Sequence, residues 1–455
     1  MVWTNRHKKI FIELIKILHK NNIKYFIYRN YSELPDKIPT NDIDIVVDPK
    51  SFSRCRRLLT IIFKNNNIEY LKTVNYGTVV GYFGIDLSAQ FVIEIDLLCG
   101  CVAMGGYEIL PFNQIYSYKT CYHGFNVIPK ELDALLLLFY KVIGWGKIKD
   151  IYIDELRMAT SSSSHSFKQL LAEILGQSET DFIINSINKN PKDLKKRHLS
   201  IARSFKLRKW IYNPIKTSNL VCKYKYHRFL KSNTPQLICV ESPDGTGKTT
   251  FISFLTKLLD LYFIGSEGNK SHIFHFRPQI LPNLGAAGEK AGIMKQDKDF
   301  TNPHRGKPVG VFSSFLRMCY YWIDYLVGMP LILQKDSQYD RITIFDRYIF
   351  DFLIDPRRSR ISLPYWIRKI FTKLVKQPQI IFILETDADT IFARKQELSK
   401  NEIIRQLKEF RRLTDISHNT HYLNASQAPE EIAKDAMKII LDTFTTKLTD
   451  YEINN

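Results

Sequence analysis

One stretch of the chain has the residue types and the spacing of a phosphate-binding loop. Residues 237–259 read LICVESPDGTGKTTFISFLTKLL. A short apolar run suited to a buried strand leads into a turn-rich loop, and apolar residues then recur at helical spacing from Phe251 onward. The backbone N–H groups of such a loop, together with the positive end of the helix dipole, can bind a polyphosphate. The residues predicted to bind it are Asp244, Gly245, Thr246, Gly247, Lys248, Thr249 and Thr250.

Two side chains of this loop have specific predicted roles. Lys248 is expected to reach the β- and γ-phosphates of ATP, and the Thr249 hydroxyl is expected to bind Mg²⁺. The chain has Ser242 where the formal pattern has its leading glycine, but the later glycines are in place. We therefore expect ATP and Mg²⁺ as cofactors. The alternative is a helix that merely begins after a glycine turn.

An acid and an arginine end a second strand pattern, ITIFDRY at residues 342–348. At the carboxyl end of a parallel strand beside a phosphate-binding loop, Asp346 can organise Mg²⁺ and the attacking group. Alternating strands and helices predict a parallel, doubly wound α/β sheet. The other strands are expected at residues 237–240, 273–276, 380–384 and 422–425, and long helices at 313–326 and 430–441.

The N-terminal part contains three acids that could share a cation. Asp42 and Asp44 lie two residues apart in a strand pattern, so both carboxylates point to one face. Residues 91–98 repeat this pattern and contain Asp96. Three converging carboxylates are suitable ligands for the Mg²⁺ of a phosphoryl-transfer centre. The alternative is that these acids lie on a solvated face of the sheet.

Composition limits the classes of protein. The chain has 455 residues, enough for two or three domains, and 45% of them are hydrophobic. Its seven cysteines include no CxxC pair, so neither zinc nor a disulfide framework is expected. No apolar run approaches the roughly 18 residues of a membrane span, and the charged, amphipathic N-terminus is not a signal peptide. We expect a cytoplasmic protein, with peripheral contact to the inner face of a membrane left open.

The formal net charge of +19 favours anionic partners. Nucleotides and phosphorylated or anionic glycans are the expected ones, and nucleic acid is not. Basic residues alternate with aromatic ones in residues 205–231, which we interpret as part of a linker. This segment is either a connector packed on both domains or an interfacial patch for acidic lipid or a polyanionic chain.

The N-terminal part resembles the minimal nucleotidyltransferases, which are related to the polymerase-β fold. The resemblance rests on YFIYRNYSELPDKIPTNDIDIVVD at residues 25–48 and VIEIDLL at residues 92–98. It implies that Asp42 and Asp44 are the family's D-x-D pair and Asp96 its third carboxylate. The family has a glycine-containing helix start before this pair, where residues 29–32 of this chain read RNYS. Residues 131–200, expected to be mostly helical, look like the helical half of such a domain.

The C-terminal part, about residues 235–450, resembles the thymidylate kinase family of nucleoside-monophosphate kinases. ESPDGTGKTT, FDRY and LETDADTIFARKQE match the family's phosphate-binding loop, its Asp-Arg motif, and its strand and lid helix. The resemblance implies that Lys248 and the lid arginine Arg394 neutralise the transferring phosphoryl group, and that Arg347, beside Asp346, holds the acceptor phosphate. A dimer would be consistent with the resemblance, and the sequence leaves the oligomeric state open.

The acceptor side departs from the family. An Arg-Glu-Pro-Gly-Gly element is reduced to residues 277–278, and extra acids and arginines follow Asp346. These departures resemble a divergent branch that is associated with bacterial surface-polysaccharide gene clusters. The residues expected on the acceptor side are Arg277, Arg317, Asp324, Arg357, Arg358 and Arg360.

We therefore predict an α/β chain with an α+β nucleotidyltransferase-like domain at 1–204, a basic aromatic linker at 205–234 and a thymidylate kinase-like domain at 235–455. The first functional hypothesis is an ATP-dependent phosphotransferase that acts on a nucleotide, a sugar or a glycan-linked acceptor. The second is a nucleotidyltransferase with a regulatory kinase-like half. The third is a non-catalytic ATP-binding organiser of a glycan-assembly complex.

Overall fold

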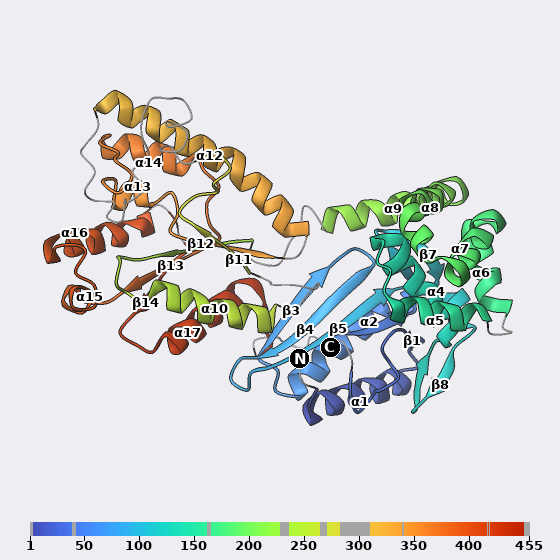
Figure 1. Ribbon diagram of the computed structural model, residues 1–455. Coiled ribbons are helices and arrows are strands. Elements are labelled where there is room, and N and C mark those ends of the chain that lie inside the picture. The colour runs from blue at the N-terminus through green and yellow to red at the C-terminus, as the bar shows by residue number, and fades with distance from the viewer. Residues whose placement is uncertain are drawn as a thin grey trace. The chain divides into compact units, whose positions relative to one another are not determined.

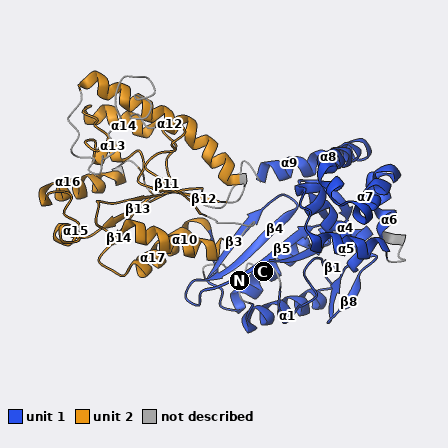
Figure 2. Ribbon diagram, in the orientation of Figure 1, with its two compact units in different colours: residues 1–233, 445–455 blue, residues 234–444 orange. Residues whose placement is uncertain are grey.

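The chain forms two compact units, which are described separately (Figure 2). Unit 1 comprises residues 1–233 and 445–455, and unit 2 comprises residues 234–444. The computed structural model describes residues 3–38, 42–161, 165–227, 236–263, 271–282, 310–338, 341–415, 417 and 419–449.

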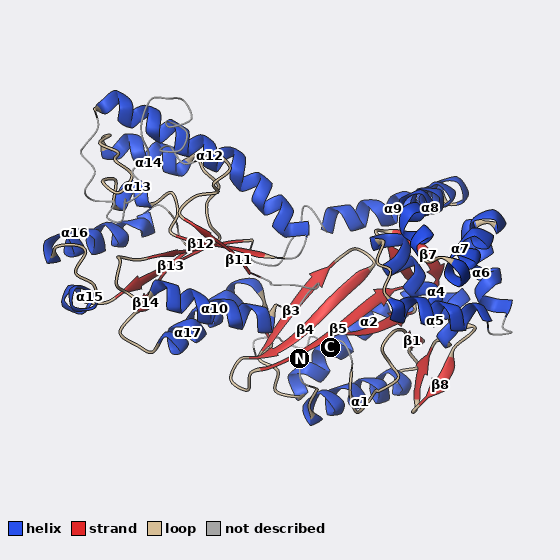
Figure 3. Ribbon diagram, in the orientation of Figure 1, coloured by secondary structure: helices blue, strands red, loops and turns tan. Residues whose placement is uncertain are grey.

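Unit 1 is built on a mixed eight-stranded sheet (Figure 3). Strands β2 and β5 at its centre are parallel, whereas β4 pairs with β5 and β1 pairs with β2 in the antiparallel sense. The eight strands, in their order across the sheet, are β15 (Thr446–Lys447), β3 (Tyr70–Asn75), β4 (Val79–Asp86), β5 (Phe91–Cys99), β2 (Asp42–Val47), β1 (Tyr25–Ile27), β9 (Phe125–Val127) and β8 (Thr120–Tyr122). A separate hairpin consists of β6 (Cys101–Met104) and β7 (Tyr107–Pro111).

Helices cover both faces of this sheet. One core contains apolar residues of α1 (Asn5–Lys20) and α2 (Phe52–Asn65) together with Ile43, Ile45 and Val47 of β2. The other contains Val46 of β2 and apolar residues of the helices that follow residue 129. These helices are α4 (Lys130–Leu137), a π-helical segment (Leu138–Ile143), α5 (Asp150–Ser161), α6 (His165–Leu175), α7 (Gln177–Lys189) and α8 (Lys192–Tyr212). The short α3 (Phe112–Tyr116) and η1 (Pro49–Ser51) and the later α9 (Pro214–Lys225) complete the helices described in unit 1.

Unit 2 is built on a parallel five-stranded sheet, as the sequence predicts. The chain passes from β10 to two strands on one side and only afterwards to two strands on the other, so β10 lies at a topological switch point. The strands, in their order across the sheet, are β11 (Ser271–His275), β12 (Ile342–Asp346), β10 (Leu237–Glu241), β13 (Ile380–Glu385) and β14 (Thr420–Asn424).

The two faces of the parallel sheet carry different helices (Figure 1). Helices α10 (Lys248–Tyr262) and α17 (Pro429–Phe444) pack against each other on one face. On the other face, Met318, Tyr325 and Met329 of α12 (Val311–Gln338) share a core with residues of β10, β12 and β13. The remaining described helices of unit 2 are α13 (Asp351–Ile354), α14 (Tyr365–Lys373), α15 (Ala388–Arg394), α16 (Lys400–Arg411) and η5 (Arg412–Asp415).

The domain boundaries differ from the prediction in two places. Residues 205–225 are not a linker: they lie in α8 and α9 of unit 1, where Phe205 and Val221 are buried. The C-terminal residues also belong to unit 1, because β15 pairs with β3 and Leu448 joins the core beneath α1. Local composition could not predict either feature, since both depend on long-range packing.

The sequence also predicts a glycine-rich loop at residues 284–292, a basic loop at 302–307 and a serine-rich loop at 161–164. The first two, and all of the third except Ser161, lie outside the described residues. None of the described helices combines the length and the apolar character needed to cross a bilayer.

Candidate functional site

The predicted phosphate-binding loop connects β10 to α10 in unit 2. Gly245 and Gly247 have φ angles of +95° and +89°, a region that side chains rarely adopt. A Cβ on Gly245 would also lie only 3.0 Å from the Cβ of Lys395. Gly247 precedes the first residue of α10, so the N–H groups of this helix end face the loop.

Ser242 takes the place of the leading glycine without straining the loop. It is fully buried, and it is not among the described residues with a positive φ. Its hydroxyl accepts a hydrogen bond of 2.7 Å from the Thr246 hydroxyl, which lies 3.1 Å from the Pro243 carbonyl oxygen. Serine in place of glycine at position 242 therefore adds a side-chain contact inside the loop, and the residue needs no left-handed backbone there.

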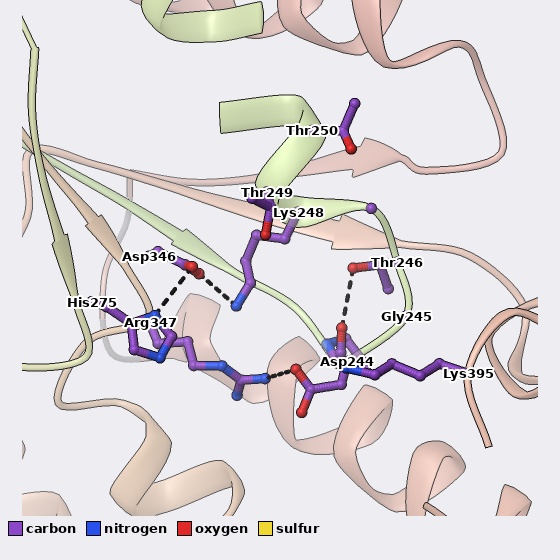
Figure 4. Close-up of a pocket in the computed structure, with 12 residues that line it drawn as sticks. Asp244, Gly245, Thr246, Lys248, Thr249, Thr250, His275, Asp346, Arg347 and Lys395 are labelled. Atoms are coloured by element: carbon purple, nitrogen blue, oxygen red, sulfur yellow. Dashed lines mark hydrogen bonds and ion pairs between the residues drawn. The ribbon is translucent and has the colours of Figure 1, made fainter. Parts of the chain in front are cut away.

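The loop residues line a cavity of about 340 Å³ (Figure 4). All seven residues predicted to bind the polyphosphate lie around it, together with Asp346 and Arg347 from the end of β12. Three further lining residues, Pro243, His275 and Lys395, were not predicted as site residues.

Lys248 and Asp346 form an ion pair at the centre of this cavity. The Lys248 Nζ lies 2.6 Å from Oδ1 of Asp346, and Nδ1 of His275 lies 3.2 Å from the other carboxylate oxygen (Figure 4). Burial lowers the pKa of Lys248, and the nearby Arg347 lowers it further. Although burial opposes it, the contacts with His275 and Lys248 hold the pKa of Asp346 below its usual range. The site therefore keeps an ionised carboxylate next to its lysine.

A second group of charges surrounds Arg347, whose side chain is only 4% exposed. Its guanidinium lies 2.5 Å from Asp244 and 3.3 Å from the buried Asp351. Arg358 binds the other oxygen of Asp244 at 3.0 Å. Although burial opposes it, the charges of Arg347 and Arg358 lower the pKa of Asp244 to about 2. Arg347 of the Asp-Arg motif thus anchors the phosphate-binding loop through Asp244.

Glu241 at the end of β10 is fully buried beside this group. Its Oε1 accepts the N–H of Tyr348 at 2.8 Å, while Oε2 has no hydrogen-bond partner among the residues that the structure describes. Burial raises the pKa of Glu241 to about 8, and the charge of Asp351 contributes to the increase. The raised pKa favours the protonated form of this side chain in the folded chain.

We expect this protonation to make the stability of unit 2 fall as the pH rises. An unfolded glutamate has a pKa of about 4.3. Between that value and about 8, the folded chain binds more protons than the unfolded chain, so stability decreases with increasing pH. Glu241→Gln removes the titration, and its stability relative to wild type should rise by up to about 1.4 kcal/mol per pH unit across this window. Hydrogen exchange of β10 amides at pH 5.5 and 7.5 measures the difference. A constant difference between the two chains would show that Glu241 does not titrate there.

The predicted acceptor residues do not line the cavity. Arg277 and Asp324 form a buried ion pair of 2.9 Å, and Asp324 also accepts the N–H groups of Gln279 and Leu281. This pair fixes the segment that follows β11 against α12. Arg358 binds Asp244, as described above, while Arg317 and Arg360 are half-buried and Arg357 is exposed.

Lys395 lines the cavity, whereas Arg394, the predicted lid arginine, does not. Arg394 is exposed, and its guanidinium donates to the Ala425 carbonyl at 3.3 Å. Lys395, the next residue, lines the cavity and lies against Gly245. The sequence predicts that this segment reaches the loop, but not which of the two adjacent basic residues faces it. Arg394 is the last residue of α15 and Lys395 is already extended, so helical spacing does not fix the direction of the second side chain. His275 could have been found as the last residue of β11, whose carboxyl end meets that of β12.

The oxygen ligands at this cavity suit Mg²⁺. The Thr249 hydroxyl and the ionised Asp346 carboxylate both line it, and hard oxygen ligands are what Mg²⁺ prefers. The loop and Lys248 offer N–H donors and positive charge on the same side, which suits a triphosphate.

Unit 1 brings its three predicted acids together. The parallel pairing of β2 and β5 sets Asp44 opposite Asp96, and carboxylate oxygens of Asp42, Asp44 and Asp96 lie within 4.8 Å of one another. Burial raises the pKa of Asp44 to about 6 and that of Asp96 well above its usual value. The prediction that they converge on one face is confirmed, and the alternative of a solvated face is wrong for Asp44, which is 3% exposed.

Comparisons with known proteins add little to this description. No family model and no curated protein sequence matched the chain. Among solved structures, the crystal structure of thymidylate kinase from Ehrlichia chaffeensis is similar, with 15% sequence identity and a TM-score of 0.30. The match covers 46% of this chain and 98% of that one. At these values the likeness carries no argument, so the function has to be argued from the site itself.

Proposed function

We propose that unit 2 is an ATP-dependent phosphotransferase. The observation that carries the proposal is the cavity at the switch point of the parallel sheet, where a phosphate-binding loop, Lys248 and Asp346 face one another. Ligands of parallel α/β sheets bind outside the carboxyl ends of the strands, at such a point. A binding module without catalysis needs no buried lysine–carboxylate pair in its phosphate site.

Each residue has a role in transfer of the γ-phosphoryl group. The loop N–H groups hold the triphosphate, and Lys248 neutralises the charge that accumulates on the transferring group. Thr249 and Asp346 would hold Mg²⁺, which when bound would further neutralise the charge of the phosphates. Arg347 holds Asp244 in the loop through its 2.5 Å contact, and Lys395, which also pairs with Glu397, lines the cavity beside Gly245. This is catalysis by positioning and electrostatics, with little covalent chemistry for the protein to perform.

The acceptor that we propose is an anionic molecule larger than dTMP, either a phosphorylated oligosaccharide, a glycan-linked group or a larger nucleotide, with a role in surface-polysaccharide synthesis. Support comes from the short segment after the Asp-Arg motif, where Arg357 is exposed and Arg358 binds Asp244 of the phosphate-binding loop. Guanidinium groups grip phosphates and carboxylates through paired hydrogen bonds.

Kinetics with alternative acceptors tests this part of the proposal. We expect kcat/KM for dTMP to fall below the ordinary enzyme range of about 10⁴–10⁸ M⁻¹s⁻¹, and at least one larger anionic acceptor to reach it. Sugar phosphates and purified anionic glycans, each assayed with ATP and Mg²⁺, are the comparison set. If dTMP itself reaches the ordinary range, the chain is a thymidylate kinase with an additional unit, and the proposed acceptor is wrong.

We also propose that α8 and α9 contact an acidic membrane surface. Leu207, Ile211 and Ile215 are exposed on these helices, although leucine and isoleucine are usually buried. Lys206 and Arg208 lie beside them in the sequence, and the exposed Lys206 can bind anionic headgroups. Cytoplasmic location with peripheral attachment is the corresponding proposal for the whole chain.

A further inference from the structure

The acidic group of unit 1 already contains a cation, the guanidinium of Arg29. Its Nε donates to Oδ2 of Asp44 at 2.9 Å, and Nη2 contacts the same oxygen. Nη2 also lies 3.5 Å from Oδ2 of Asp42. One planar cation thus bridges the two β2 carboxylates on the face where they meet Asp96.

The backbone around Arg29 is held in an unusual conformation that places this side chain. Arg29 and Asn30 follow β1 with φ angles of +60° and +51°, which cost about 1–2 kcal/mol per residue for side chains of this kind. The N–H of Arg29 donates to Oδ1 of the largely buried Asp133 on α4 at 2.9 Å. The cost of the strained backbone is therefore offset by a specific anchor from the helical half.

Two tyrosines fix the guanidinium from its sides. The Cζ of Arg29 lies 5.1 Å from the ring centre of Tyr28 and 5.7 Å from that of Tyr140. Cations at such distances are attracted to aromatic rings. Tyr140 is in turn anchored through its hydroxyl, which donates to the Ala103 carbonyl at 2.5 Å. The left-handed backbone, the hydrogen bond to Asp133 and the two tyrosine rings thus all hold Arg29 close to the three acids.

We propose that Arg29 is the resident counter-ion of Asp42, Asp44 and Asp96, and that it takes the position that a divalent cation would need. Nε and Nη2 of Arg29 together take up Oδ2 of Asp44, and the positive charge of the guanidinium repels a divalent cation that must lie about 2.0–2.6 Å from its carboxylate ligands. A positive charge of the chain itself therefore already balances part of the negative charge of this group. While Arg29 is bound to Asp44, unit 1 cannot carry out metal-dependent nucleotidyl transfer, whatever the activity of unit 2.

Mn²⁺ binding to the full-length chain, without nucleotide, tests the proposal. Free Mn²⁺ is measured by electron paramagnetic resonance for wild type, Asp44→Asn, Arg29→Met and the double variant Arg29→Met/Asp44→Asn. Wild type and Asp44→Asn should bind equal numbers of ions, because Asp42, Asp44 and Asp96 hold no metal ion while Arg29 is in place. Arg29→Met should bind one ion more per chain, and the double variant should lose it. Sites elsewhere, including the unit 2 cavity, contribute equally to all four chains.

Two results would overturn the proposal. The first is that Asp44→Asn binds one ion fewer than wild type. This would mean that the three acids hold a metal ion even with Arg29 in place. The second is that folded Arg29→Met gains no ion. The conservative variant Arg29→Lys, which keeps a positive charge, should gain none. If Arg29→Met does not fold, the comparison of wild type with Asp44→Asn still decides the question.

Discussion

Replacement of Lys248 by alanine is expected to abolish ATP turnover while unit 2 stays folded. The Nζ group is the positive charge closest to Asp346 in the cavity, and its loss removes the group that neutralises the transferring phosphoryl. A loss of several kcal/mol of transition-state stabilisation corresponds to a rate decrease of about 10³-fold or more. Steady-state release or transfer of phosphate from ATP measures it.

Lys257→Ala is the matched control for this variant. Lys257 lies on the same helix, α10, but is exposed and stacks over Phe254 away from the loop. Its turnover should equal that of wild type. Wild-type turnover in a folded Lys248→Ala chain would remove the phosphate-binding loop from the mechanism.

The second large effect is expected on stability, from Arg347→Met. Arg347 is the buried partner of both Asp244 and Asp351, and the Asp351 side chain is only 1% exposed. Removing the cation leaves a buried carboxylate uncompensated, which typically costs about 3–5 kcal/mol. Hydrogen exchange of the β10 and β12 amides reports the free energy of opening of unit 2 without requiring two-state unfolding of the whole chain.

An exposed pair in the same unit provides the comparison. Arg412 binds Glu409 at 2.8 Å, but its side chain is 62% exposed, so Arg412→Met should change stability by no more than about 0.5–1 kcal/mol. The double variant Arg347→Met/Asp351→Asn should recover part of the lost stability, because it also removes the buried Asp351 charge that has lost its partner. If Arg347→Met costs no more than Arg412→Met, the buried network does not hold the loop.

Local sequence patterns predicted the elements of unit 2 well. The strand at 342–346, the glycine turns at Gly245 and Gly247 and the helix from Lys248 all follow from apolar periodicity and turn chemistry within a few residues. The parallel sheet follows from alternation of strands and helices. The convergence of Asp42, Asp44 and Asp96 was predictable for the same reason, because two-residue alternation sets side chains on one face.

What the sequence did not predict depends on contacts between distant segments. The choice of Lys395 over Arg394, the place of His275 beside Asp346 and the return of residues 446–447 to the sheet of unit 1 all require the packed structure. The role of Arg29 was missed for a different reason. The nucleotidyltransferase pattern has glycine near residues 29–32, but in this chain Arg29 and Asn30 themselves adopt the left-handed backbone.

The central claim is that this chain transfers the γ-phosphoryl group of ATP, and isotope transfer tests it most directly. Parallel reactions contain ATP labelled in the α- or the γ-phosphate, Mg²⁺ and a mixture of nucleotide, sugar phosphate and glycan acceptors. The account predicts that label moves to an acceptor only from the γ-position, and that Lys248→Ala abolishes the transfer. Transfer of the α-label would instead show a nucleotidyltransferase, and would also contradict a counter-ion role for Arg29. Transfer of neither label, by a chain that binds ATP, would identify a non-catalytic organiser and contradict the account.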